Sequence, residues 1–179
     1  LATTNLPLKA GKGHLYEGGI RVPLFIKWNK NLKPHVDTKS IVLGMDIFPT
    51  LLELSTDQKV AGVDGKSYAQ VLKGKETWGD RTVFWISKKA RPHSTGDSKA
   101  AVVRSGDYKL IQFLETKAIE LYNLKEDVGE ENNLAEKEPA KTAQLLQLLK
   151  DWKKEYLVPE KTKIYKPKDK GKTNKKSKK

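Results

Sequence analysis

Residues 11–23 form the stretch GKGHLYEGGIRVP, which decides how the rest of the chain is interpreted. Four glycines stand there among charged side chains that include Lys12, Glu17 and Arg21. Glycine lets the backbone approach a ligand closely or adopt positive φ, and charged groups among such glycines suit an anion site. Residues 24–28, LFIKW, follow directly and predict a short, mostly apolar strand. We therefore interpret the stretch as an anion-binding loop held on a rigid frame.

Composition and charge exclude several classes of protein. The chain has 179 residues, no cysteine and a net charge of +13. It therefore has no disulfide and no thiolate zinc site, and no apolar window is long enough to predict a membrane span. Residues 161–179 hold ten lysines and a single acid, Asp169, so they carry +9 and leave +4 for the first 160 residues. The basic character belongs to the end of the chain, and nothing resembles a nucleic-acid-binding motif.

The first part of the chain predicts few elements. Asp46 is placed to cap a helix over Ile47–Ser55, and Ser67 is placed to cap a short helix that stops at Gly74. One apolar strand and one helix in residues 1–55 are too little to close a core. We expect this part to be the last piece of a larger α/β domain. The apolar face of the first helix comprises Ile47, Phe48, Leu51, Leu52 and Leu54.

The second part predicts a compact sheet. Four short apolar runs with turn-length links indicate an antiparallel arrangement, and Ser105-Gly106-Asp107 is a hairpin signal. Pro139 opens an amphipathic helix to Tyr156 that would cover one face of this sheet, giving an α+β subdomain. The apolar set of that helix is Leu145, Leu146, Leu148, Leu149, Trp152 and Tyr156. The four predicted strands are Thr82–Ile86, Ala100–Arg104, Tyr108–Leu114 and Ile119–Leu124.

These patterns divide the chain into three parts. Residues 1–74 are the incomplete end of an α/β domain, and residues 75–158 are the α+β subdomain with its four-stranded antiparallel sheet and long C-terminal helix. Residues 159–179 are too polar and lysine-rich to bury apolar surface, so they are predicted to be disordered. That tail has two open interpretations, a tether to a polyanion or membrane surface and a solvated end. The start at Leu1, without methionine or signal peptide, is interpreted as a start within a longer protein.

A family likeness emerges from these motifs in order. Residues 11–23 closely resemble the late signature G-K-G-x-x-Y-E-G-G-x-R-x-P of the type I, formylglycine-dependent sulfatases of the alkaline phosphatase superfamily. Four further segments resemble that family's downstream motifs in the same order, which is more specific than any single motif. Val128 departs, since the family usually has proline there. The four segments are residues 45–54, 62–67, 103–111 and 120–124.

The resemblance implies an activity and also implies missing parts. Such enzymes hydrolyse sulfate esters, here of a sulfated small molecule or polysaccharide, with a formylglycine made from a C/S-x-P-x-R motif and a calcium ion held by Asp and Asn. This chain has no such motif and no metal ligands, because those parts lie earlier in the family's order. The implied partner is therefore the missing N-terminal part of the same enzyme. Alone, the chain is expected to be inactive, and the resemblance implies a periplasmic or secreted location.

Candidate site residues follow from the same match. Lys12 matches the family lysine that contacts the substrate sulfate, and a compact ammonium can stabilise charge that develops on an anionic oxygen. His14 could hydrogen-bond substrate or donate a proton to the leaving oxygen. Arg91 and His93 lie in a subdomain loop that in this family often edges the substrate pocket, and they suit a sulfated sugar. Glu17 and Arg21 are interpreted as structural, as an ion pair or backbone clamp that holds the loop.

Two other functions remain open from the residues alone. One is a non-catalytic module that binds a polyanion through the basic tail and the sheet. The other keeps the superfamily but changes the ester to a phosphodiester or a phosphonate. The division of charge argues against the first, because the first 160 residues carry only +4 and so lack a basic face. The stretch at residues 11–23 favours a sulfatase over the second.

Overall fold

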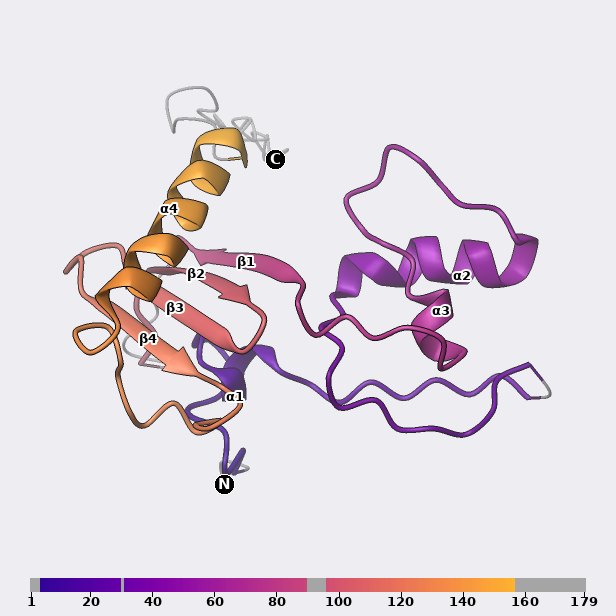
Figure 1. Cartoon of the computed structure of the whole chain (residues 1–179), viewed down its shortest axis with the longest axis horizontal. Helices are drawn as coiled ribbons and strands as arrows, with labels where there is room; N and C mark the ends of the chain where they lie inside the picture. Colours follow the sequence, from indigo (N-terminus) through magenta and orange to yellow (C-terminus); the bar gives the residue numbers. More distant parts are fainter. Residues whose placement is uncertain (1–3, 30, 90–95, 157–179) are drawn as a thin grey trace, which may run out of the picture.

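A four-stranded antiparallel sheet and one long helix form the centre of the computed structural model (Figure 1). The structure describes residues 4–29, 31–89 and 96–156. The strands follow one another in sheet order, as the sequence predicts. They are β1 (Thr82–Ser87), β2 (Ala100–Ser105), β3 (Tyr108–Phe113) and β4 (Ile119–Asn123), and the helix is α4 (Pro139–Tyr156).

Local turns fix the register of the sheet. Ser105 pairs with Tyr108, and Gly106 between them has φ +58°, a conformation that glycine adopts without strain. The amide of Leu124 donates to the carbonyl of Asp107 at 2.8 Å, which ties the end of β4 to this hairpin. The predicted hairpin and all four predicted strands are confirmed within one residue at each end.

Helix α4 covers one face of the sheet. Leu145 and Leu149 are fully buried against Ala101, Val103 and Leu110. The ring of Phe84 stacks on that of Trp152, with centroids 5.0 Å apart. The predicted apolar set is wrong at Leu148 and Tyr156, which are exposed because the sheet is wide enough to cover only one stripe of the helix.

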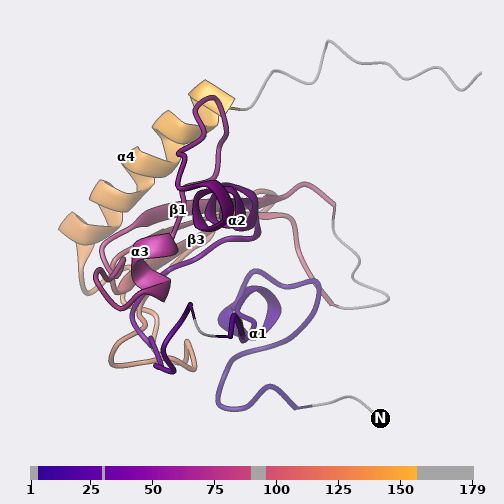
Figure 2. The ribbon, with the colours of Figure 1, turned by 90° about the vertical axis from the view of Figure 1, so that its right-hand side faces the viewer.

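The opposite face of the sheet is covered by the glycine-rich loop, residues 9–20, which ends in the short helix α1 (Glu17–Ile20). Figures 1 and 2 place α1 and α4 on opposite sides of the sheet. Leu15 and Tyr16 pack there on a cluster made of Ala100, Val102, Ile111, Tyr122 and Leu124. The sheet therefore holds the loop directly, although the two are far apart in sequence.

The strand predicted at residues 24–28 does not form. This segment is extended, but it pairs with no other strand in the part of the chain that the structure describes. Phe25 is 89% exposed and Val22 is 78% exposed. A strand needs a neighbour for its amide and carbonyl groups, and none of the described residues supplies one.

A smaller layer is built on a buried aspartate (right of the sheet in Figure 1). It contains a 3₁₀ turn, η1 (Gly44–Asp46), and helices α2 (Ile47–Thr56) and α3 (Ala69–Leu72). Asp46 precedes α2 as predicted, but its carboxylate accepts no hydrogen bond from that helix. It accepts instead from the amides of Leu43 (2.7 Å) and Lys66 (2.8 Å) and from the guanidinium of Arg81. Burial raises the pKa of Asp46, and these donors outweigh that effect, so its pKa lies below the usual range.

Helix α2 turns its polar side inward. Thr50 and Glu53 are buried, and the Thr50 hydroxyl donates to the Asp46 carbonyl (2.6 Å) and accepts from the Tyr68 amide (2.9 Å). Ile47, Phe48 and Leu51, which were predicted to form the buried face, are exposed instead. The prediction fails because the apolar stripe has no cover within the described residues.

Replacing Asp46 with alanine should destabilise the chain strongly. The change leaves Arg81 and two amides without their buried acceptor, and breaking such a pair costs about 3–5 kcal/mol. The measurement is urea unfolding of the purified chain at pH 7, followed by tryptophan fluorescence. Asp64→Ala, at an exposed carboxylate, is the matched control and should change the free energy of unfolding by less than about 0.5 kcal/mol. Equal effects of the two changes would contradict the role given to Asp46.

Candidate functional site

The glycine-rich loop closes on itself through its backbone. The amide of Gly18 donates to the carbonyl of Lys9 (3.0 Å), and the amide of His14 donates to that of Gly11 (3.0 Å). The side chain of Asn5 donates to the carbonyl of Ala10 (3.1 Å). These bonds join the two ends of the loop, so that the residues between them lie on a tight turn.

Two glycines make this closure possible. A Cβ at Gly18 would collide with the carbonyl oxygens of Lys9 and Ala10, and one at Gly19 would collide with the carbonyl of His14. The glycine pair is thus required by close backbone approach rather than by unusual φ.

Lys12 lies on the outside of the closed turn and is exposed. Within residues 4–29, 31–89 and 96–156, no hydrogen bond or ion pair involves its side chain. Gly13 beside it has φ 106°. The loop therefore presents one ammonium group that the described residues leave available to an anion.

The other predicted site residues are only partly placed. The His14 ring is half-buried beside the Tyr16 ring, with centroids 6.3 Å apart, and it lies close to Gly96. Gly96 follows His93 by three residues in the sequence. Those two residues lie outside the described residues, as does the predicted tail from residue 159.

Beneath the loop lies a buried charge triad of Glu17, Lys109 and Glu130. The Lys109 ammonium is fully buried, 3.0 Å from a Glu17 carboxylate oxygen and 2.8 Å from one of Glu130. The amide of Glu17 also donates to the Glu130 carboxylate at 2.6 Å. Arg104 and Arg21 approach the second Glu17 oxygen at 3.6 and 3.8 Å. The interpretation of Glu17 and Arg21 as structural agrees with this geometry.

Burial shifts the pKa values of the acidic and basic groups around this triad in opposite directions. It raises the pKa of Glu130, although Lys109 and the Glu17 amide favour the charged carboxylate. Burial also lowers the pKa of Arg104, which Glu17 opposes. Each of these groups depends on a neighbour of opposite sign to remain charged in the interior.

A second layer of contacts surrounds Lys9. Its ammonium lies 4.4 Å from the Tyr16 ring centroid and 5.3 Å from that of Tyr122, and it donates to the Glu130 carbonyl at 2.9 Å. The hydroxyls of Tyr16 and Tyr122 both donate to the Glu120 carboxylate, at 2.7 and 2.9 Å. Burial and this carboxylate raise the pKa of both tyrosines, which stay neutral donors.

Sequence reasoning missed Lys9, Lys109 and Glu130. The available signal was the position of Lys109: strand alternation puts it on the same face as Ile111, so a lysine faces inward on a buried strand. An inward lysine requires a buried acid. Nothing local indicates which acid, because Glu17 and Glu130 come from distant segments.

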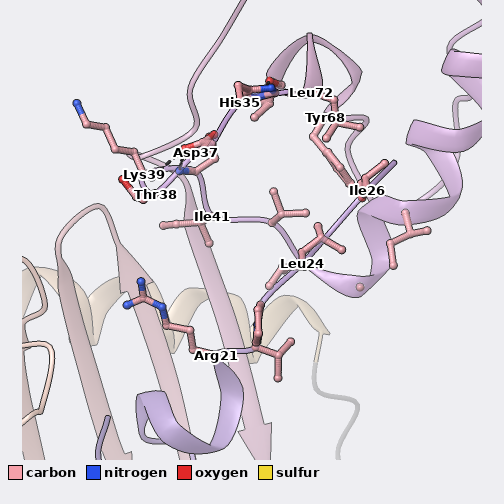
Figure 3. Close-up of a pocket in the computed structure, with 18 of the residues that line it drawn as sticks. Arg21, Leu24, Ile26, His35, Asp37, Thr38, Lys39, Ile41, Tyr68 and Leu72 are labelled. Carbon is pink, nitrogen blue, oxygen red and sulfur yellow. Dashed lines mark hydrogen bonds between the residues drawn. The ribbon is translucent and has the colours of Figure 1, made fainter. Parts of the chain in front are cut away.

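A cavity of about 1070 Å³ lies between the extended segment after α1 and the region of α3, and it reaches the base of the glycine-rich loop at Glu17, Arg21 and Arg104. Figure 3 shows Leu24 and Ile26 on that segment, facing Ile41, Tyr68 and Leu72. Neither Lys12 nor His14 lines it. This cavity and the candidate anion site at Lys12 therefore do not coincide.

The described residues show neither a metal centre nor a membrane helix. No group of three or more His, Cys, Asp or Glu side chains among them could hold a metal ion. Likewise, none of the helices in those ranges is long and apolar enough to cross a membrane.

The fold and the loop agree with sequence comparison. Residues 10–156 match the family described as N-sulphoglucosamine sulphohydrolase, C-terminal. The chain therefore belongs to the sulfatases of the alkaline phosphatase superfamily, as part of their C-terminal region. A sulfatase of Formosa agariphila is 36% identical over 148 residues, which are 77% of this chain and 27% of that protein. Across the first four curated relatives, the chain spans 25–30% of their length.

Two solved structures share the fold. Ps i-CgsB in complex with k-i-k-neocarrahexaose superposes with a TM-score of 0.67 and 24% identity, over 83% of this chain and 32% of that one. A protein solved with its substrate D-glucosamine-2-N,6-O-disulfate gives a TM-score of 0.53 and 25% identity, over 66% of this chain and 25% of that one. The predicted sheet with its C-terminal helix is thus the arrangement of the sulfatase C-terminal subdomain.

Replacing Gly18 with alanine should open the loop. The new methyl would meet two carbonyl oxygens, and such overpacking costs about 1–3 kcal/mol. Amide hydrogen exchange in residues 9–20 should therefore become faster. Gly44→Ala is the matched control, because no atom lies within 4 Å of a Cβ there. Unchanged exchange in the Gly18→Ala loop would show that close packing does not hold it.

Proposed function

We propose that this chain supplies the sulfate-binding loop and part of the substrate pocket of a sulfatase. The observation that carries the proposal is the closed glycine-rich loop, which presents Lys12 with no partner among the described residues, in a chain of the sulfatase family. The reaction is the hydrolysis of a sulfate ester to an alcohol and sulfate.

Lys12 is proposed to bind a sulfate oxygen. Its ammonium is a compact point charge that can donate three hydrogen bonds, and the glycines beside it let a tetrahedral anion come close. Negative charge builds up on the ester oxygens as the sulfur–oxygen bond breaks. A cation already in place stabilises that charge more than it stabilises the bound ester.

His14, Arg91 and His93 are proposed to contact the rest of the substrate. The support is position: His14 lies on the same turn as Lys12 and close to Gly96, which follows the segment that holds the other two. Two imidazoles and a guanidinium suit the hydroxyl and sulfate groups of a sugar. The structure solved with D-glucosamine-2-N,6-O-disulfate is a relative whose substrate is of this kind, so we propose a sulfated sugar here.

The remaining chemistry is assigned to a part of the enzyme upstream of this chain. The sulfatase resemblance implies a formylglycine nucleophile and a calcium ion, and the described residues offer no cluster for a metal. We therefore place both groups on the preceding segment, which the 25–30% share of the relatives' length leaves room for. Export to the periplasm or the medium is part of the same proposal.

The isolated 179-residue chain should not release sulfate, whereas a protein extended upstream through the missing motifs should. The reason is that the loop can bind a sulfate ester but cannot cleave it without the nucleophile. Sulfate release from an aryl sulfate and from sulfated monosaccharides measures the difference. Turnover by the isolated chain, at a rate that survives repurification, would refute the division of the active site.

In the extended enzyme, Lys12→Ala should lower kcat/KM by about 10²–10³-fold, as the loss of an oxyanion-site donor does. Steady-state kinetics on the best substrate tests this. Lys150→Ala, at an exposed position of α4, is the control and should leave kcat/KM unchanged. An effect of Lys12→Ala no larger than that of the control would refute the sulfate contact.

A further inference from the structure

We propose that Lys109 is a positioning residue: through the buried charge triad, the β-sheet sets the place of the loop that carries Lys12. This inference rests on the proposed function, because it gives the triad a role in the same site. Lys109 itself does not touch the substrate. It acts by holding Glu17.

The triad holds the loop at Glu17 through two contacts, one to the side chain and one to the backbone. Lys109, in the middle of the sheet on β3, binds the Glu17 carboxylate at 3.0 Å, while the Glu130 carboxylate accepts the Glu17 amide at 2.6 Å. Lys109 also joins the two acids, because its ammonium lies 2.8 Å from Glu130. Both the side chain and the backbone of Glu17 are thus fixed to the sheet side.

The balance of charge makes the attachment of Glu17 depend on Lys109. The triad alone holds two carboxylates and one ammonium, all 2% exposed or less. Of the two acids, only Glu17 has Arg104 and Arg21 within 4 Å, at 3.6 and 3.8 Å. Without Lys109, the Glu130 carboxylate would face Glu17 with no cation of its own in a site closed to water. Moving the loop off the sheet would separate the two carboxylates and return Glu17 to solvent.

A displacement of Glu17 would also displace Lys12, because hydrogen bonds and close backbone contacts hold the loop together as a unit. Glu17 follows Lys12 by five residues. Between them the turn is closed by the His14–Gly11 hydrogen bond, and it is joined to Lys9 at Gly18. Gly18 and Gly19 already touch the backbone of the opposite side of the loop. The loop therefore moves as one piece.

The test is a double-mutant cycle in the sulfatase that contains this chain. Lys109→Met should lower kcat/KM on the order of 10²-fold, the cost of a small displacement of catalytic groups. Lys12→Ala should lower it as proposed above. The double variant should be little worse than Lys12→Ala alone, because both changes remove the same contact. Losses that multiply would overturn the proposal.

Two further variants separate position from stability. Leu149→Ala removes a fully buried side chain on the opposite face of the sheet. It should lower the Tm about as much as Lys109→Met does, while kcat/KM per folded molecule stays within about threefold of the wild-type value. Adding Glu130→Gln to Lys109→Met restores the charge of the triad and should recover about tenfold in kcat/KM. If Leu149→Ala matches the loss in Lys109→Met, or if the added change recovers nothing, the proposal is wrong.

Hydrogen exchange on the same proteins decides the claim without turnover. Lys109→Met should speed exchange of the loop amides of His14, Gly18 and Gly19 while the β2–β3 amides stay protected. Loop exchange equal to wild type would overturn the positioning role, whatever the kinetics. If Lys12→Ala leaves kcat/KM unchanged while Lys109→Met speeds loop exchange, the proposed function is refuted and the positioning of the loop by Lys109 still holds.

Discussion

The structure depends on burying one lysine between two carboxylates. Removing Lys109, Glu17 and Glu130 from water costs several kcal/mol per ion, and only close pairing offsets it. That pairing joins a strand, the glycine-rich loop and the connector after β4. An apolar contact could hold them equally well, but it would not hold them at one orientation, since apolar contacts are not directional.

The sheet therefore serves two layers with different needs. On one face it meets α4 through aliphatic packing, where Leu145 and Leu149 fill space. On the other it meets the loop through charges, tyrosine hydroxyls and the Lys9 cation. The first contact gives stability, and the second gives a fixed place to residues that face solvent. The proposed sulfate-binding role needs both, because an anion site works only where its donors are aligned before the charge develops.

Local patterns predicted the parts of the fold that local physics determines. Strand alternation, the Gly106 turn and the spacing of leucines in α4 gave the sheet, its order and its helix. Prediction failed where the partner lies elsewhere. Residues 24–28 have the composition of a strand but no partner strand among the described residues, and Phe48 and Leu51 on α2 are exposed to solvent. The loop was found from its glycines and Lys12, whereas its attachment was missed, because Lys109 and Glu17 lie 92 residues apart.

The unpaired segment after α1 has a consequence for how such a chain must be made. It is extended, carries Val22 and Phe25 in the open, and keeps its backbone hydrogen-bonding groups unused by any strand of the described residues. An open edge of this kind is a template on which a second copy can add, so chains in a crowded solution can pair there. In the enzyme proposed above, an upstream part that folds first and pairs with this segment would occupy the edge as soon as it left the ribosome.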